Sequence, residues 1–169
     1  MGTSPRRCRS LCLLLLPLIF PASLAGQGGE DGVVIQLTHD FMHALSSRNT
    51  EFLDGLLAPQ ATLYSLREGE EGPVYGVRTR ESFLEGLQGG STVFLERIWE
   101  PVVEVSGGVA MVWAPYDFHL DGVFSHCGVD VLTFLRLEGG WKVANVTYDV
   151  VREGCEPSPL GAPVGAPGD

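Results

Sequence analysis

The apolar positions in the first part of the chain follow a helical period. Between residues 31 and 47 they recur at three- and four-residue intervals, which places them on one face of a helix. A second short helix is expected from residue 49 or 50 to the stop at Pro59, and a third over residues 79–87. The apolar face of the first helix consists of Val34, Leu37, Phe41 and Leu45.

After residue 91 the pattern changes to long β segments separated by glycine-rich turns. The expected turns are Ser106-Gly107-Gly108, Asp121-Gly122 and Glu138-Gly139-Gly140, and Asp-Gly is a strong signal for a two-residue hairpin. Helices followed by a long antiparallel meander predict an α+β fold. The strands are expected at about 61–66, 74–77, 92–105, 109–120, 123–137 and 141–152.

The two-residue Asp-Gly turn sets the register of the hairpin around it. In this register Asp117 lies opposite His126 and Trp113 lies opposite Asp130, and alternation puts these side chains on one face together with Phe134. An apolar wall that carries a few titratable groups suits a small-molecule pocket. We therefore take His126, Asp117 and Asp130 as candidate catalytic residues, and Trp113 and Phe134 as candidate ligand contacts.

Two structural interpretations of the same residues stay open. His126 and Asp117 could form a cross-strand ion pair at the sheet edge, and Asp130 could bond the backbone or the indole N–H of Trp113. A slip of one residue in the register would also move the whole set to the other face of the sheet.

Two further residues are candidate ligand contacts. If Gly139-Gly140 forms the next turn, Asn145 lies on the same face as His126. Tyr116, expected opposite Cys127 on the more apolar face, is the second.

Cys127 and Cys155 are the two cysteines that follow the N-terminal segment. The predicted register brings Cys127 near Arg152, three residues before Cys155, so a disulfide between the two is feasible. The alternative is a buried free Cys127 and a Cys155 in a loose tail.

Residues 1–25 have the layout of a secretory signal peptide. A basic start precedes a ten-residue apolar run, and small residues stand at Ser23 and Ala25. The run is about half as long as a bilayer span, and a retained membrane helix is the alternative. The sequence thus predicts a periplasmic or secreted protein without a membrane anchor after cleavage. Its folded domain is expected over 30–155, and a disordered tail rich in Pro and Gly over 156–169.

Charge and absent motifs narrow the function. The formal net charge is −10, with 21 Asp+Glu against 11 Lys+Arg, so a nucleic-acid binder that neutralises phosphates is not expected. There is no C-x-x-C, G-x-S-x-G, P-loop or dinucleotide fingerprint, and we expect no cofactor. His39 and His43 have the spacing of two metal ligands on a helix but face away from its apolar stripe, so we expect no metal site.

Several short motifs resemble the nuclear transport factor 2-like superfamily. They are W-A-P-Y-D-F at 113–118, D-G at 121–122, H-C-G-V-D at 126–130 and G-W-K-V at 140–143. Within that superfamily the chain is most similar to an exported bacterial group labelled lumazine-binding. The resemblance implies a cone-shaped fold in which N-terminal helices pack on a strongly curved antiparallel sheet. It also implies a pocket between helices and sheet, and a homodimer that pairs through sheet faces.

Because this fold hosts both enzymes and binding proteins, it does not decide the function. Our first hypothesis is an exported protein that binds a small apolar or aromatic molecule inside the cone. The second is an isomerase- or cyclase-like enzyme in which His126 with Asp117, or Asp130, abstracts a proton. The third is a structural dimer without a ligand.

Overall fold

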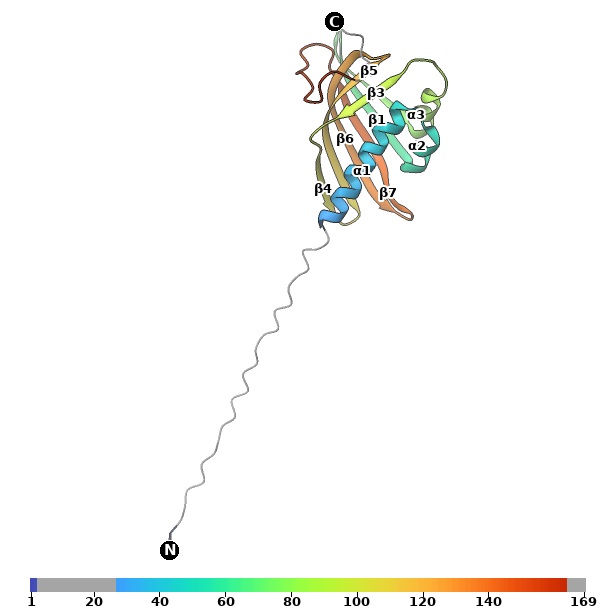
Figure 1. The fold of residues 1–169 in the computed structure, drawn as a ribbon. Coiled ribbons are helices and arrows are strands. Elements are labelled where there is room, and N and C mark those ends of the chain that lie inside the picture. The colour runs from blue at the N-terminus through green and yellow to red at the C-terminus, as the bar shows by residue number, and fades with distance from the viewer. Residues whose placement is uncertain (3–26, 164–169) are drawn as a thin grey trace.

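The computed structural model describes residues 1–2 and 27–163 (Figure 1). Apart from its first two residues, the predicted signal peptide lies outside the described residues, as do residues 164–169 of the predicted tail. In the described part of the chain, no helix is both long and apolar enough to cross a bilayer. The helices are α1 (Gln27–Ser46), α2 (Thr50–Leu56) and α3 (Arg80–Leu87). The strands are β1 (Leu57–Gly69), β2 (Gly72–Thr79), β3 (Phe94–Ile98), β4 (Val102–Ser106), β5 (Val109–Leu120), β6 (Val123–Leu137) and β7 (Gly140–Val150).

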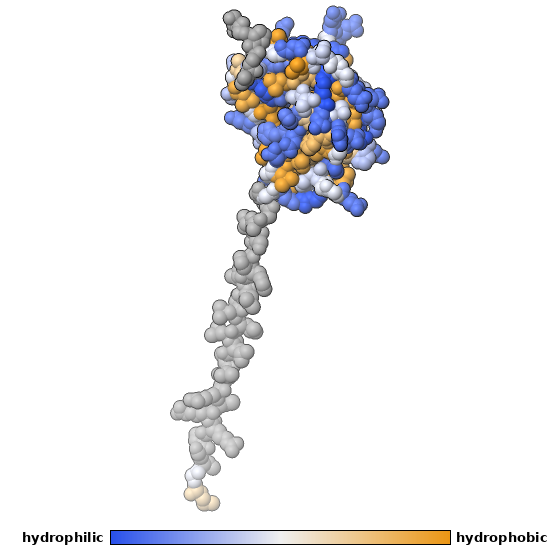
Figure 2. Space-filling view, turned by 45° about the vertical axis from the view of Figure 1, so that its right-hand side comes forward, coloured by the Kyte–Doolittle hydropathy of each residue, from blue (hydrophilic) through white to orange (hydrophobic). Residues whose placement is uncertain are grey.

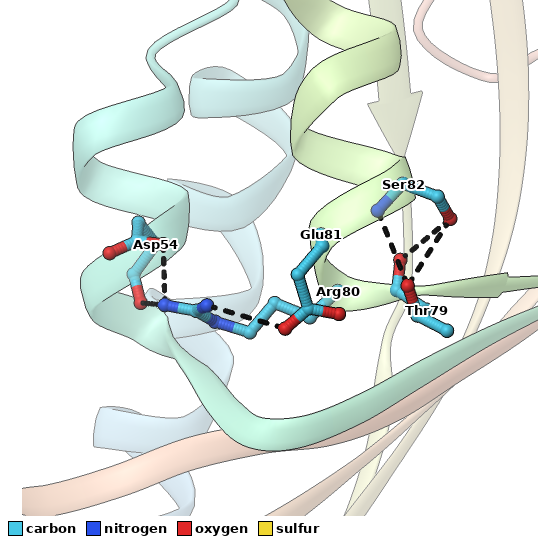
Figure 3. Close-up of polar contacts among 5 residues, drawn as sticks. All are labelled: Asp54, Thr79, Arg80, Glu81 and Ser82. Carbon is cyan, nitrogen blue, oxygen red and sulfur yellow. Dashed lines mark hydrogen bonds and ion pairs between the residues drawn. The ribbon is translucent and has the colours of Figure 1, made fainter.

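The two short helices begin at capping side chains and are joined by an ion pair. Figure 3 shows the Thr79 cap of α3 and the pair between Arg80 and Asp54. The side chain of Asn49 accepts a hydrogen bond from the backbone N–H three residues further on, at 3.0 Å. The side chain of Thr79 does the same for α3 at 3.3 Å, so each cap satisfies a donor that the helix itself leaves open. Arg80 in α3 pairs with the carboxylate of Asp54 in α2. These contacts hold α2 and α3 together at one side of the sheet (Figure 1).

The seven strands form one sheet in the order β2-β1-β7-β6-β5-β3, with β4 also paired to β5. All neighbouring pairs are antiparallel except β1 and β7, which are parallel. Helix α1 runs across one face of this sheet and packs on β3, β4 and β5 (Figure 1). The predicted α+β fold class is confirmed.

The core lies between α1 and the inner face of the sheet. Phe41 of α1 is buried, as are Val112, Leu132 and Phe134 of the central strands, which have no exposed surface. The surface mixes hydrophilic residues with apolar patches, as the space-filling view shows for one side (Figure 2).

The β5–β6 hairpin begins in the predicted register and then departs from it. Asp121 and Gly122 form the turn with φ of 51° and 79°, and the residues that flank them pair as predicted. Ser125 is then an extra residue in β6, because His119 faces Phe124 while the preceding residue of β5 already faces His126. Such a β-bulge shifts the pairing by one residue, and a one-residue shift exchanges the two faces of the strand.

The bulge makes the predicted pairs wrong. Asp117 lies opposite Cys127, not His126, and Trp113 lies opposite Val131, not Asp130. Asp117 and Trp113 therefore lie on the outer face of the sheet, whereas the inner face keeps Asp130.

The predicted face of Asn145 is also wrong. The β6–β7 turn falls at residues 138 and 139, because Leu137 pairs with Gly140, and a second irregularity follows before the pair Thr133–Asn145. As a result Tyr148 stands opposite Asp130, and Asn145 lies on the outer face with its side chain donating to the Thr62 carbonyl at 3.0 Å.

The segment expected as one strand over 92–105 is two strands. β3 and β4 follow one another along the same edge of β5. Between them Glu100 has a φ of 46° and precedes Pro101, and both features interrupt an extended strand.

A disulfide joins Cys127 in β6 to Cys155 beyond β7, with their Cα atoms 6.1 Å apart. This disulfide confirms the predicted pairing. Cys127 and Val151 exchange two backbone hydrogen bonds of 2.9 Å, which brings the chain that leads to Cys155 close to Cys127. The chain then returns toward β3, where the carbonyl of Gly161 accepts a hydrogen bond of 2.9 Å from Arg97. Gly161, in the segment expected to be disordered, thus contacts β3.

Loss of this disulfide should destabilise the fold. The bond closes a loop across a sequence separation of 28, and removing such a cross-link costs about 3.6 kcal/mol through the freedom gained by the unfolded chain. We expect the double variant C127S/C155S to lose about this much free energy of unfolding in urea. Reduction of the wild-type protein should give the same loss and leave the variant unchanged. Equal stability of oxidised and reduced wild type would contradict the prediction.

Candidate functional site

A cavity of about 190 Å³ lies between α1, α3 and the inner face of the sheet. Most of its wall is apolar, and the polar side chains come from the strands. Such a cavity, mostly apolar with a few converging polar groups, is the usual form of a small-molecule site. Its apolar lining residues are Phe41, Leu45, Leu63, Phe83, Leu87, Phe94, Phe118 and Val146. Its polar lining residues are Arg78, Glu96, Tyr116, His126, Asp130 and Tyr148.

Two carboxyl groups meet in this cavity. Glu96 on β3 and Asp130 on β6 both line it and act on each other's pKa, although the residues lie in separate parts of the sequence. Two carboxylates can only accept hydrogen bonds, so a bond between the two groups requires a proton on one of them. Oδ2 of Asp130 is buried and has no hydrogen-bond partner among the described residues. Because burial raises the pKa of both acids, the pair retains a proton near neutral pH.

Burial explains why the pair keeps this proton. Asp130 is only 2 % exposed, and burial raises its pKa to about 7 even though the hydrogen bond from Glu96 acts in the opposite direction. Burial also raises the pKa of Glu96 well above its ordinary value, and the charge of Asp130 adds to this. Both effects follow from placing charge in an apolar space where water is excluded.

His126 lines the cavity as a neutral imidazole. Its ring stacks on Phe118 with centroids 5.0 Å apart and meets the edge of Tyr116 at 5.7 Å. Burial lowers the pKa of His126, and the positive charge of Arg152 adds to the effect. His126 Nδ1 is 3.0 Å from the hydroxyl of Ser125, the bulge residue.

Tyr116 lines the cavity, and its hydroxyl has a backbone partner. The hydroxyl donates a hydrogen bond of 2.7 Å to the carbonyl of Asp149. The ring packs over Gly128, where an added Cβ would lie 2.9 Å from it and even closer to Asp149. Gly128 is thus required by the close approach of these two residues.

The structure places Asp117 outside the cavity, which corrects its predicted role beside His126. On the outer face Asp117 receives two hydrogen bonds from Arg97, at 2.8 and 2.5 Å, and His119 lies 3.4 Å away. Burial raises the pKa of Asp117, but the hydrogen bonds and charge of Arg97 outweigh it, so the pKa lies below its usual value. Asp117 is therefore a structural partner of Arg97.

Three predicted ligand contacts also lie elsewhere. Trp113 is 41 % exposed on the outer face, and Asn145 bonds Thr62 on that face. Phe134 faces inward as predicted but is fully buried in the core and does not line the cavity. Of the predicted site residues, His126, Asp130 and Tyr116 lie together in it.

Glu96 is the main residue that sequence reasoning missed. It stands between Phe94 and Ile98 in the alternation of β3, so its side chain points to the same inner face as theirs. An acidic residue between two inward apolar positions is the signal that could have identified it.

Comparison with known proteins identifies the fold. No protein-family model and no curated protein matches the sequence. An NTF2-like protein from Cytophaga hutchinsonii matches the structure with a TM-score of 0.60 and 12% identity, covering 71% of this chain and 97% of its own. A dehydratase candidate of the NTF2-like family from Streptomyces avermitilis matches with a TM-score of 0.57 and 17% identity, covering 73% of this chain and 97% of its own.

A third match is the beta subunit of a candidate aromatic-ring-hydroxylating dioxygenase from Novosphingobium aromaticivorans. Its TM-score is 0.61 and its identity is 13%, over 80% of this chain and 97% of the subunit. At these identities the likeness concerns the fold alone, so the chain has the NTF2-like fold. The narrower resemblance to the exported lumazine-binding group stays a prediction.

The acid pair should make stability fall as pH rises. Because the folded protein holds protons on Glu96 and Asp130 that the unfolded chain releases above about pH 4.5, the free energy of unfolding decreases with pH until both folded-state pKa values are passed. Asp130→Asn removes the buried charge. Relative to wild type it should gain at least about 1 kcal/mol of stability between about pH 5 and 8 in urea unfolding.

Asp117→Asn is the matched control. The pKa of Asp117 is lower in the folded protein than in the unfolded chain, so the ionised group stabilises the fold at any pH above its unfolded-state pKa. This stabilisation is lost only as the pH falls through the lower folded-state pKa. Asp117→Asn should therefore be less stable than wild type by a constant amount between about pH 5 and 8. A constant difference for Asp130→Asn as well would refute the raised pKa.

Proposed function

We propose that this protein binds a small, mainly apolar molecule in the cavity, with an oxygen atom of the ligand at the Glu96–Asp130 pair. The observation that carries the proposal is a cavity with an aromatic and aliphatic wall and a protonated carboxyl pair as its buried polar feature. A dry cavity of about 150 Å³ is large enough to hold benzene. The volume of about 190 Å³ therefore suits one or two fused rings.

The acid pair is suited to an uncharged oxygen at that end. A carbonyl or hydroxyl oxygen can accept the proton that the pair holds, and a hydroxyl can donate to Oδ2 of Asp130, which has no other donor among the described residues. An anionic group placed there would meet the buried charge of Asp130 and lose its water as well. The pair thus selects neutral polar groups for the deep end of the cavity.

Binding of 2-naphthol and naphthalene tests this proposal. We expect the wild-type protein to quench or shift the fluorescence of both probes saturably and to bind 2-naphthol about tenfold more tightly, because only 2-naphthol bonds the pair. Asp130→Leu should abolish that preference while it keeps naphthalene binding.

Glu104→Gln is the control, because Glu104 is exposed on β4 and away from the cavity. It should bind both probes as the wild type does. No saturable binding of either probe, or an equal effect of Glu104→Gln, would contradict the proposal.

A second candidate function is proton transfer on a carbonyl compound. Asp130, with a pKa near neutral pH, is poised as a general base, and the protonated Glu96 beside it can donate to a carbonyl oxygen. The base would take a proton from the carbon next to the carbonyl while Glu96 stabilises the enolate oxygen. The predicted alternative base, His126 with Asp117, is not available because the two lie on opposite faces.

Exchange of the α-protons of 2-tetralone in D₂O, followed by NMR, tests this second function. The protein should accelerate the exchange, and the rate should rise with pH through about 7 as Asp130 loses its proton. Asp130→Asn should reduce the acceleration by about a hundredfold or more. Exchange no faster than in buffer would contradict the proton-transfer function and leave only the binding function as a proposal.

We further propose that the protein is exported. The predicted signal peptide carries this proposal, and the Cys127–Cys155 disulfide supports it because such bonds persist in oxidising compartments. The predicted homodimer also stays a proposal. It would pair the outer faces of two sheets, which expose the apolar side chains of Val102, Val109, Met111 and Trp113.

A further inference from the structure

Arg78 brings a positive charge to the wall of the cavity. It stands on β2, the edge strand of the sheet, and is the one arginine or lysine among the cavity's lining residues in the described chain. Among the arginines that the structure describes, Arg48, Arg80, Arg97 and Arg136 have polar partners. Arg78 has no ion pair and no side-chain hydrogen bond within the described residues. Its hydrogen-bond donors are therefore open to a ligand.

The fold places this charge across the cavity from the acid pair. Arg78 pairs with Leu63 of β1, and Leu63 pairs with Val146 of β7. Both of these apolar residues line the cavity. β2 and β6 are three strands apart, which is about 14 Å at the usual strand spacing. An apolar floor thus separates a cationic end from the Glu96–Asp130 end.

The Arg78 side chain is exposed and lies beside α3. A Cβ added to Gly86 in α3 would lie 3.8 Å from Nη1 of Arg78. This position is in the last turn of α3, whose free carbonyls carry partial negative charge and favour a cation. Burial raises the pKa of the Tyr148 hydroxyl, and the nearby charge of Arg78 opposes that rise. Its exposure and its position beside α3 and Tyr148 put the guanidinium on the solvent side of the cavity wall.

We propose that the ligand of this cavity is an amphipathic monocarboxylate, held by its carboxylate at Arg78, by its apolar body over Leu63 and Val146, and by a neutral oxygen at the Glu96–Asp130 pair. This inference rests on the proposed binding function. The protein carries a formal net charge of −10, which disfavours anions at a distance. A local cation is therefore needed to accept one, and arginine matches a carboxylate with two parallel hydrogen bonds.

Two probes with the same ring system test the inference. 6-Hydroxy-2-naphthoate carries a hydroxyl at one end and a carboxylate at the other, and 2-naphthol lacks the carboxylate. The wild-type protein should bind 6-hydroxy-2-naphthoate about tenfold more tightly than 2-naphthol in fluorescence titrations. Added NaCl should reduce this preference, because the rim is accessible to solvent.

Substitutions at Arg78 separate this inference from the proposed function. Arg78→Gln should lower the affinity for 6-hydroxy-2-naphthoate to that for 2-naphthol and leave the affinity for 2-naphthol unchanged. Arg78→Lys should retain part of the preference for the carboxylate. Arg67→Gln is the matched control, since Arg67 is exposed on neighbouring β1 and does not line the cavity. Asp130→Leu should weaken both probes.

The outcomes are distinct. If 2-naphthol binds but the carboxylate gives no advantage, or Arg78→Gln has no effect, the carboxylate inference is overturned and the binding function stands. An equal effect of Arg67→Gln would show general charge attraction at the surface and would overturn it too. If neither probe binds, the binding function and this inference both fail.

Discussion

One extra residue in β6 determines which side chains face the cavity. Because Ser125 bulges out of the β5–β6 ladder, each side chain of β6 beyond it lies on the opposite face of the sheet from the one that an unbroken ladder would give it. His126 and Asp130 thereby join Tyr116 and Phe118 on the inner face, while Asp117 is left outside. Without the bulge, His126 and Asp130 would lie on the same face as Asp117 and Trp113 and would leave the face of Tyr116. The site and the outer-face ion pair both depend on this single insertion.

The two faces of the sheet shift the pKa values of two aspartates of the same hairpin in opposite directions. Outside, Asp117 meets Arg97 and stays ionised with a pKa below its usual value. Inside, Asp130 meets another acid in an apolar space, and burial raises its pKa. The cavity therefore offers a hydrogen-bond donor and a nearly neutral acceptor at neutral pH, which favours uncharged oxygen atoms. Arg78 at the rim supplies the complementary charge at the other end.

Local signals in the sequence predict the elements well. The helices follow from the spacing of apolar residues, and the Asp121-Gly122 turn is at the predicted position because its backbone needs positive φ. The disulfide is predicted because the ends of β6 and β7 meet in either register. The facing of side chains is not predicted, since Ser125 carries no feature that marks a bulge. Glu96 was missed because it meets Asp130 only through the pairing of β3 with β5, a contact set by the whole sheet.

The central claim is that Glu96 and Asp130 share a proton inside the cavity at neutral pH. The most direct measurement is a pH titration by NMR with ¹³C at the carboxyl carbons of aspartate and glutamate. We predict that one aspartate and one glutamate signal titrate far above the others, and that the first is absent in Asp130→Asn and the second in Glu96→Gln. Titration of every carboxyl group at or below about pH 5 would contradict the account.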